Sequence, residues 1–363
     1  MVRLLFVSYA YPPSIGGVEQ HSQRLVRALA ARGHQITVIT AAVAGAPAHE
    51  REPGIEIVRV ARGTGSRWRK MATFLAAMTA AALRRRDQFD LIHVQQLLYP
   101  AAVMTAVARV LDKPIVVRNS GSGVHGGVQL MQRVPLGSHA LSLIRSRATI
   151  VSLSEEMNRE LETAGFPAVV KIGNGVAERA LPTREAARAR LGLDPTAFVV
   201  LYMGRLDIEK GTAHLAAAWP HLAAHAILLV AGDGPQRELL VRAGARVDGF
   251  VADVSPYLAA ADVFVLPSES EGISNALLEA MSAGLAVVAS DVGGNREVVS
   301  EPSLGVLVPA SSPEALVAAL SALQQNPGRR AALGRAAREL VERDRSFEAM
   351  VSAYERLYAE LSA

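Results

Sequence analysis

The order of the apolar segments is the feature of this 363-residue chain that most restricts its fold. In the first half, short apolar runs alternate with longer stretches in which apolar residues recur at helical spacing. Strand, helix and strand in repetition predict right-handed crossovers and a parallel, doubly wound α/β sheet. The buried strands expected in this half cover residues 3–8, 35–40, 91–94, 115–117 and 149–153.

The alternation begins again in the second half and predicts a second unit of the same class. The join is expected near Asn174 and Gly175, a dipeptide suited to a tight turn, just before a polar helix over residues 184–191. Doubly wound sheets bind ligands at the carboxyl ends of their strands, so a cleft between the two halves is the natural ligand site. The last segment, residues 346–361, carries one broad apolar stripe, and its periodicity does not tell which half it covers. The strands expected in the second half cover residues 198–203, 226–231, 263–266, 286–289 and 305–308.

The composition argues against several classes of protein. The chain has no cysteine, which excludes disulfides and thiolate metal sites, and no leader precedes the first apolar run, so we expect a cytoplasmic protein. The longest apolar run, residues 71–83, is too short to cross a membrane, because a spanning helix needs about 20 residues. Aromatic residues make up 5% of the chain and are not interleaved with basic ones, which argues against a nucleic-acid partner.

Basic residues bracket the longest apolar run, and this bracket has two interpretations. It can bind anionic lipid headgroups, which would place the 67–86 segment in peripheral contact with the inner membrane face. It can also be an ordinary crossover helix with solvated ends. The net charge of +4 does not separate the two. The basic residues are Arg67, Arg69 and Lys70 before the run and Arg84, Arg85 and Arg86 after it.

A glycine pair follows the first predicted strand. Gly16 and Gly17 stand directly before a helical pattern whose apolar face includes Leu25, Val26 and Leu29. Glycines let a ligand approach the backbone closely, and the N–H groups of a helix start attract phosphate. A simple strand-to-helix turn is the alternative, and these residues alone do not decide between them.

Two cations share the loop that follows the first strand of the second half. Arg205 offers a planar fork and Lys210 a mobile point charge, and both could reach one anion. This pairing suits a diphosphate whose negative charge grows as its bond to a sugar breaks. A solvated loop is the alternative. After the next strand, residues 232–235 predict a tight turn.

Two glutamates separated by seven residues give the sharpest signal. Glu271 is expected in the loop before a helix over residues 274–282, and Glu279 about two turns into that helix, so both can face one elongated ligand. Between them, the N–H groups of residues 272–275 form a helix start that would stabilise a phosphate. Carboxylates that accept from sugar hydroxyls beside such a helix end fit a sugar nucleotide. A solvated helix face is a poorer interpretation of Glu279, because its neighbours in sequence are apolar.

In these motifs the chain resembles family 4 of the glycosyltransferases, which have the GT-B fold. The match runs through nearly the whole length and consists of several motifs in order. They are Gly16-Gly17-Val18-Glu19, Arg32-Gly33-His34, Asp90-Leu91-Ile92-His93, Asn174-Gly175-Val176, Gly204-Arg205-Leu206 with Lys210-Gly211, Gly232-Asp233-Gly234-Pro235, residues 261–268, residues 271–279 and residues 283–289.

The resemblance implies two Rossmann-like domains that face each other across a cleft, with the final helix returning to the first domain. Residues 1–173 and 346–363 would form the acceptor-side domain, and residues 174–345 the nucleotide-sugar donor domain. The implied enzyme is a retaining hexosyltransferase that uses a nucleotide-diphosphate donor, with a UDP sugar expected. Its acceptor would be a hydroxyl of a small molecule, a glycan or a lipid-linked compound. The resemblance implies no metal and no cofactor.

The resemblance also implies roles for individual residues in a front-face displacement. Arg205 and Lys210 would neutralise the diphosphate, whose own oxygen takes the proton of the acceptor hydroxyl, and Glu271 would hold sugar hydroxyls. The remaining donor contacts would come from the backbone and from one further carboxylate. They are Gly16 and Gly17 against the phosphates and the sugar, Gly272, Ile273, Ser274 and Asn275 at the helix start, Glu279 at the ribose, and Phe250 and Val251 at the base.

The chain departs from the family after the strand at residues 115–117. Many members carry a histidine there, and this chain has Ser120 at the corresponding position. His125, five residues on in a glycine-rich loop, either reaches the acceptor or sugar in its place or has no such role. Two alternatives stay open beside the transferase: a sugar-nucleotide 2-epimerase built on the same two-domain plan, and, because of Ser120, a catalytically silent subunit that only binds the donor.

Overall fold

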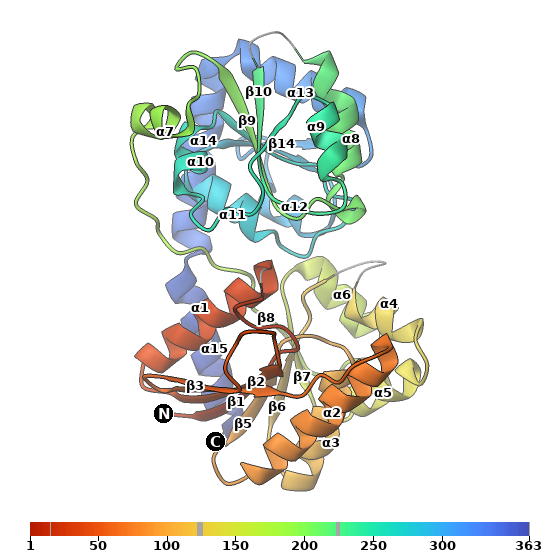
Figure 1. Cartoon of the computed structure of the whole chain (residues 1–363). Coiled ribbons are helices and arrows are strands. Elements are labelled where there is room, and N and C mark those ends of the chain that lie inside the picture. Colours follow the sequence, from red (N-terminus) through yellow and green to blue (C-terminus); the bar gives the residue numbers. More distant parts are fainter. Residues whose placement is uncertain (15, 122–125, 223–225, 363) are drawn as a thin grey trace. The chain divides into compact units, whose positions relative to one another are not determined.

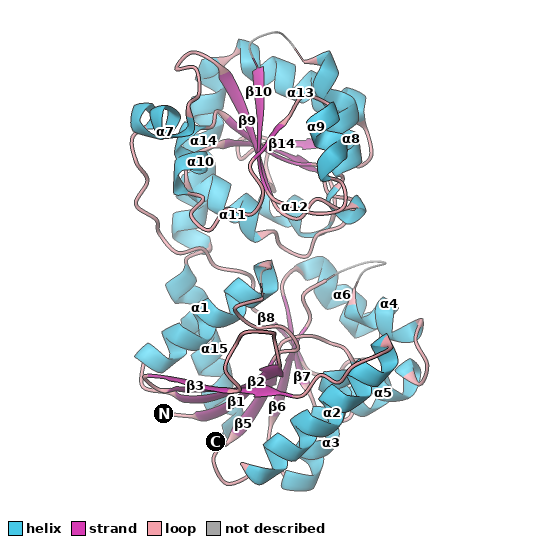
Figure 2. Cartoon of the chain, in the orientation of Figure 1, coloured by secondary structure: helices cyan, strands magenta, loops and turns pink. Residues whose placement is uncertain are grey.

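The computed structural model describes residues 1–14, 16–121, 126–222 and 226–362, and the chain divides into two compact units. The first unit comprises Met1–Ile172 and Val351–Ala363, and the second comprises Gly173–Met350. Each unit is built on one sheet with helices on both faces (Figure 1, Figure 2). The predicted fold class, two Rossmann-like doubly wound units, is confirmed.

The first unit holds an eight-stranded sheet in the order β3-β4-β2-β1-β5-β6-β7-β8. All neighbours pair in parallel except the edge strand β3, which is antiparallel to β4. The strands are β1 (Arg3–Val7), β2 (Gln35–Ala41), β3 (His49–Glu52), β4 (Ile55–Val60), β5 (Leu91–Val94), β6 (Ile115–Arg118), β7 (Thr149–Ser152) and β8 (Val169–Lys171). The helices between them are α1 (Gly17–Ala31), α2 (Arg67–Arg84), α3 (Tyr99–Leu111), α4 (Gly127–Gln132), α5 (Gly137–Arg145) and α6 (Glu155–Thr163).

The final helix, α15 (Phe347–Ser362), belongs to the first unit from Val351 onward. Its apolar stripe is buried there, including Val351 and Leu357. Glu355, on the polar side, accepts a hydrogen bond from Arg32 at the end of α1 and pairs with His34 at 2.9 Å. In Figure 1 the blue helix accordingly lies beside the red α1. The periodicity had left open which half this helix covers, and the structure places most of it on the first.

The second unit holds a six-stranded, all-parallel sheet in the order β11-β10-β9-β12-β13-β14. Its strands are β9 (Phe198–Met203), β10 (Ala226–Ala231), β11 (Arg246–Val247), β12 (Val263–Leu266), β13 (Ala286–Ser290) and β14 (Val306–Val308). Its helices are α7 (Arg184–Leu191), α8 (Thr212–Ala218), α9 (Arg237–Arg242), α10 (Ser255–Ala260), α11 (Asn275–Ser282), α12 (Gly293–Val298), α13 (Pro313–Gln325) and α14 (Pro327–Asp344), with short 3-10 turns η2 (Ile208–Lys210) and η3 (Trp219–His221).

Both sheets have a point where the strand order reverses. In the second unit the chain moves outward from β9 to β10 and β11, then returns to lay β12 on the other side of β9. The first unit repeats this plan, with β1 and β5 as neighbours at the reversal. Ligands of doubly wound sheets bind outside the carboxyl ends of the strands at such a switch point. The loops after β9 and β12, and those after β1 and β5, therefore border the positions at which sheets of this kind bind ligands.

The sequence missed four strands, of which three have two to four residues and β4 has six, five of them buried. Strands β9, β10 and β12 have the predicted bounds, whereas β3, β4, β8 and β11 were not predicted. β3 is a charged edge strand with the sequence HERE, and β8 and β11 have three and two residues, none of them buried. Such segments carry little apolar pattern from which to identify a strand.

Helix α2 contains the apolar run, and the last two residues of the basic bracket, Arg85 and Arg86, follow its end. Phe74, Met78, Ala81 and Ala82 of this helix are buried in the first unit, whereas Trp68 near its start is 57% exposed. Within the ranges described, no helix is both long enough and apolar enough to serve as a membrane span.

Candidate active site

The loops after β9 and β12 lie against each other at the switch point of the second unit. Gly211 in the first loop has φ +63°, and a Cβ there would collide with the carbonyl group of Pro267, which follows β12. The backbone N–H of Glu269 donates to the carbonyl oxygen of Glu209 at 2.9 Å and joins the two loops again. Glycine at position 211 thus serves both the left-handed turn and the close approach of the second loop.

Lys210 and Glu271 form the central ion pair of these loops. The Nζ atom of Lys210 lies 2.6 Å from Oε1 of Glu271, and the hydroxyl of Ser268 donates to the same oxygen at 2.8 Å. The Glu271 side chain is only 7% exposed, and that of Lys210 is 23% exposed. The carboxylate is therefore fixed by a cation and a hydroxyl, and the ammonium has further N–H donors for a second anion.

Arg205, the other predicted cation, is oriented differently. Its guanidinium is 64% exposed and pairs with Asp207 at 2.8 Å and with Glu209 at 3.7 Å, both in its own loop. The hydroxyl of Tyr202 donates to the Arg205 carbonyl oxygen at 2.8 Å and fixes the backbone of Arg205. Burial raises the pKa of Tyr202 well above its usual value, so this donor stays protonated. The two cations share a loop, and their predicted convergence on one anion stays a prediction.

The start of helix α11 follows Glu271 directly. Ser274 is the N-cap, and its hydroxyl accepts from the backbone N–H of Leu277 at 3.4 Å. The side-chain amide of Asn174 donates to the carbonyl oxygen of Ile273 at 2.8 Å and holds the backbone just before the helix. Gly294 packs so closely on the carbonyl group of Gly272 that a Cβ would not fit. The predicted residues Gly272, Ile273, Ser274 and Asn275 thus form an ordered helix start beside the Lys210–Glu271 pair.

Glu279 lies on the second turn of α11. The helix begins at Asn275, so Glu279 is about one turn from its start rather than the two turns predicted. Leu278 and Ala280 on either side are buried, and the Glu279 side chain is 15% exposed. Its Oε1 atom lies 3.4 Å from the guanidinium of Arg179, a residue that the sequence analysis did not single out.

The segment predicted to hold a nucleobase follows the short strand β11. Phe250 is 49% exposed and Val251 is partly buried. Just before them, Gly249 bridges to Gly232 after β10. The turn at residues 232–235 also packs on the Arg205 loop, since a Cβ at Gly232 would collide with Gly204. The loops after β9 and β10 therefore need small residues where they meet.

The glycine pair of the first unit starts helix α1. Gly16 is the N-cap in an extended conformation (φ 168°), which any residue can adopt, and Gly17 is the first helical residue. A Cβ at Gly16 would meet the carboxylate of Glu19, which folds back toward the helix start. An acidic group at this end of a helix interacts favourably with the dipole.

Ser120 lies after β6 beside a buried arginine. The guanidinium of Arg118 donates to the Ser120 hydroxyl at 2.7 Å, and the hydroxyl is 3.5 Å from the carbonyl oxygen of Gln95 after β5. Burial lowers the pKa of Arg118, which also interacts with Tyr354 on the last helix. His125 lies outside the described residues.

A buried polar network beside Ser120 was missed by sequence reasoning. His93 on β5 stacks on Phe6 with ring centroids 4.7 Å apart, and its Nδ1 atom lies 2.7 Å from the hydroxyl of Tyr358. Its Nε2 atom lies 3.2 Å from Gln95. Burial lowers the pKa of His93 to about 3, so the ring is neutral at pH 7. His93 itself lies in the Asp90-Leu91-Ile92-His93 motif, but nothing in the sequence indicated its contacts with Gln95 and Tyr358.

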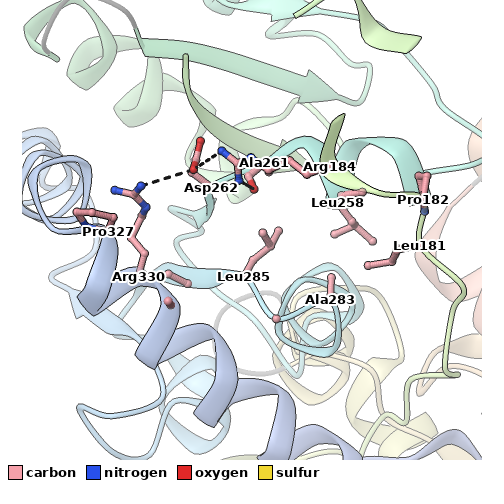
Figure 3. A pocket seen from close by; sticks show the side chains of 14 residues that line it. Leu181, Pro182, Arg184, Leu258, Ala261, Asp262, Ala283, Leu285, Pro327 and Arg330 are labelled. Carbon is pink, nitrogen blue, oxygen red and sulfur yellow. Dashed lines mark hydrogen bonds and ion pairs between the residues drawn. The ribbon is translucent and has the colours of Figure 1, made fainter. Parts of the chain in front are cut away.

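A cavity of about 400 Å³ lies at the amino-terminal ends of β12 and β13, the opposite edge of the sheet (Figure 3). At one side Asp262 accepts from Arg184 at 2.7 Å and pairs with Arg330 at 3.7 Å. Arg188 donates to its other oxygen at 2.9 Å, as does the backbone N–H of Val199 at 2.8 Å. This carboxylate joins α7, β9, β12 and α14, and we assign it a structural role.

Across the part of the chain that is described, no group of three or more His, Asp or Glu side chains lies close enough together to hold a metal ion. Metal independence itself stays a prediction.

Two units of this topology, each with its loops gathered at a switch point, are the GT-B fold. Family models match both halves, "Glycosyltransferase Family 4" over residues 15–179 and "Glycosyl transferases group 1" over residues 197–326. A glycogen synthase of Mycobacterium tuberculosis is 30% identical, and the alignment covers 98% of this chain and 94% of that protein. The chain belongs to glycosyltransferase family 4 and is a glycosyltransferase.

Solved structures agree on the fold. A sucrose-phosphate synthase from Thermosynechococcus elongatus superposes with a TM-score of 0.84 at 23% identity, covering 99% of each chain. Anabaena HepE in complex with UDP-glucose superposes with a TM-score of 0.82 at 18% identity, covering 99% of this chain and all of that one.

Proposed function

We propose that this family 4 glycosyltransferase transfers a sugar, with retention of configuration and without a metal, from a nucleotide diphosphate to an acceptor hydroxyl. A UDP sugar is the expected donor. The observation that carries the proposal is the Lys210–Glu271 pair at 2.6 Å beside the capped start of α11. A cation and a helix start supply two stabilising elements for a diphosphate, and the adjacent fixed carboxylate can accept from sugar hydroxyls. The nucleotide sugar bound by HepE agrees with this donor class.

In the proposed reaction the acceptor hydroxyl attacks the anomeric carbon on the face from which the diphosphate leaves. The bond between that carbon and the phosphate oxygen breaks as the new glycosidic bond forms. The departing diphosphate oxygen takes the proton of the acceptor hydroxyl. Lys210, Arg205 and the N–H groups at the start of α11 would stabilise the growing negative charge. Glu271 would orient the sugar, so positioning and electrostatics supply the rate.

Gly16 and Gly17 would border the phosphates and sugar from the first unit, and Ser120 would contact the acceptor or the sugar. Phe250, Val251 and Glu279 would bind the nucleoside end of the donor. The acceptor class stays open between small molecules, glycans and lipid-linked compounds.

A peripheral contact with anionic membranes is a separate proposal. It rests on the basic ends of α2 and on the exposed Trp68 ring, because the apolar stripe of α2 faces the core.

A donor screen tests the proposed function. Thermal shift with UDP, GDP and ADP sugars should show a rise in melting temperature for one base, with UDP sugars expected. The selected donor is then incubated with and without acceptors, in EDTA, and the product is examined by NMR. Transfer with the donor's anomeric configuration, undiminished by EDTA, supports the proposal. An inverted product, loss of activity in EDTA, or an epimerised sugar nucleotide in the absence of acceptor would each contradict part of it.

A further inference from the structure

Arg179 connects two parts of the second unit, helix α11 and the start of helix α10. Its guanidinium lies 3.4 Å from Oε1 of Glu279 on α11 and 3.5 Å from the hydroxyl of Ser255 at the start of α10. It also lies 3.9 Å from Asp253, whose carboxylate accepts from the backbone N–H of Ser255 at 3.0 Å. One side chain therefore joins α11 to the loop that enters α10.

The contact between Arg179 and Glu279 is close-packed. The two side chains are 28% and 15% exposed. The space that they border, together with Leu258 and Ser282, amounts to about 20 Å³. A space of that size holds about one water molecule, so no sugar ring fits between them. The guanidinium thus supports the carboxylate from the side, and a ligand would have to approach Glu279 from another direction.

We infer that Arg179 is a positioning residue for the nucleoside end of the donor. This inference rests on the proposed function, in which Glu279 accepts from the ribose hydroxyls and residues 250–251 hold the base. A glutamate on a helix surface can rotate among several rotamers, and an arginine beside it restricts that freedom and keeps the acceptor oxygens aimed. Through Asp253 and Ser255, the same guanidinium ties the end of the base-binding loop to Glu279. Arg179 acts through these groups and need not touch the nucleotide.

The test compares Arg179→Met and Arg179→Lys with the unaltered chain. Arg338→Met is the matched control, because Arg338 lies in the same unit and pairs with Glu342 on the surface of α14. We expect Arg179→Met to raise the donor KM about fivefold, as suits the loss of one partly exposed ion pair, with kcat and the acceptor KM unchanged. The Kd for the free nucleoside diphosphate, UDP in the expected case, should rise by the same factor. Arg179→Lys should recover part of the loss, and Arg338→Met should change nothing.

Glu279→Gln separates this inference from the proposed function. If Glu279→Gln raises the donor KM and a folded Arg179→Met does not, the positioning role is wrong and the assignment of Glu279 stands. If neither variant changes the donor KM, both the positioning role and the proposed donor site are wrong. A lower Kd for UDP in Arg179→Met would show that Arg179 competes with the ribose for Glu279, and would also overturn the inference. In the double variant the effects should not add, because the two residues act as one unit.

Discussion

The switch points of the two units share a topology and differ in their polar chemistry. In the second unit, Lys210 and Glu271 form an ion pair at the loop surface, with the cation 23% exposed. In the first unit, the corresponding region holds His93, Gln95 and Tyr358, which are buried and bonded to one another. In the proposed function, the Lys210–Glu271 pair of the second unit binds an incoming anion. The buried network of the first unit instead holds the last helix, so the two units use one strand plan with different polar chemistry.

The largest expected effect concerns the Lys210–Glu271 pair of the second unit. Lys210→Ala should lower kcat/KM about 100- to 1,000-fold, because it removes the charge that the proposed function assigns to the leaving diphosphate. Steady-state rates with the donor chosen by the screen give this value. The melting temperature should also fall, because the Glu271 side chain is 7% exposed and loses its cation, so rates are compared at a temperature where the variant and the unaltered chain are both folded.

Lys171→Ala is the control for Lys210→Ala. Lys171 ends β8 in the first unit and pairs with Glu155, so its replacement should leave the rate unchanged. If the two variants were equally active, the role that the proposed function gives to Lys210 would be wrong. The contrast between the two switch points would then have no bearing on activity.

The sequence predicted more of the residues at the switch point of the second unit than at that of the first. The reason is how far apart in sequence the interacting residues of each unit lie. Lys210 and Glu271 lie in loops that follow predicted strands, and the carboxyl ends of parallel strands meet at one edge, so the meeting of these two loops was predictable. That Lys210 bonds Glu271 while Arg205 bonds Asp207 depends on side-chain rotamers, which periodicity does not encode.

The network of the first unit was not predictable in the same way. His93 and Tyr358 are 265 residues apart, and no local pattern relates them. The Arg179–Glu279 contact, 100 residues apart in sequence, was missed for the same reason. The fold followed from local periodicity, whereas these contacts depend on how the packed elements meet.

The next effect distinguishes the contribution of Arg205 from that of Lys210, the two cations of the loop after β9. Arg205→Ala should lower kcat/KM about 30-fold, less than Lys210→Ala, because the exposed guanidinium is screened by solvent and already pairs with Asp207 and Glu209. Arg205→Lys should recover little, since a lysine lacks the planar fork. Arg237→Ala, in the same unit and partly exposed, is the control. A larger loss for Arg205 than for Lys210 would reverse the ranking and make Arg205 the main phosphate contact.

The stability of the first unit should depend on pH through its buried histidine, His93. The folded pKa of His93 is about 3, against an ordinary 6.5, so below pH 6.5 the unfolded chain binds a proton that the folded chain does not. Stability is therefore lost as the pH falls from 6.5 toward 3, and by pH 5 this one residue should account for about 2 kcal/mol. His21, whose pKa is also lowered by burial, should add to the effect.

Urea unfolding at pH 7 and pH 5 measures this loss. In a Trp219→Phe background, Trp68 reports on the first unit alone. His93→Gln should reduce the pH dependence, leaving the part that belongs to His21, whereas His49→Gln on the exposed edge strand should not. A pH dependence unchanged by His93→Gln would show that the buried histidine is not the group that titrates.

The smallest effect compares two N-caps of the second unit. Ser274 caps α11 at the proposed phosphate site, and Ser312 caps α13, where its hydroxyl accepts from Ala315 at 3.3 Å. Each Ser→Ala change should cost about 1 kcal/mol of unfolding free energy, because each removes one cap hydrogen bond. Only Ser274→Ala should also raise the donor KM, since a frayed helix start presents its N–H groups poorly to phosphate. If Ser312→Ala raised the donor KM as much, the change would reflect general loosening of the unit, and the start of α11 would lose its special place in donor binding.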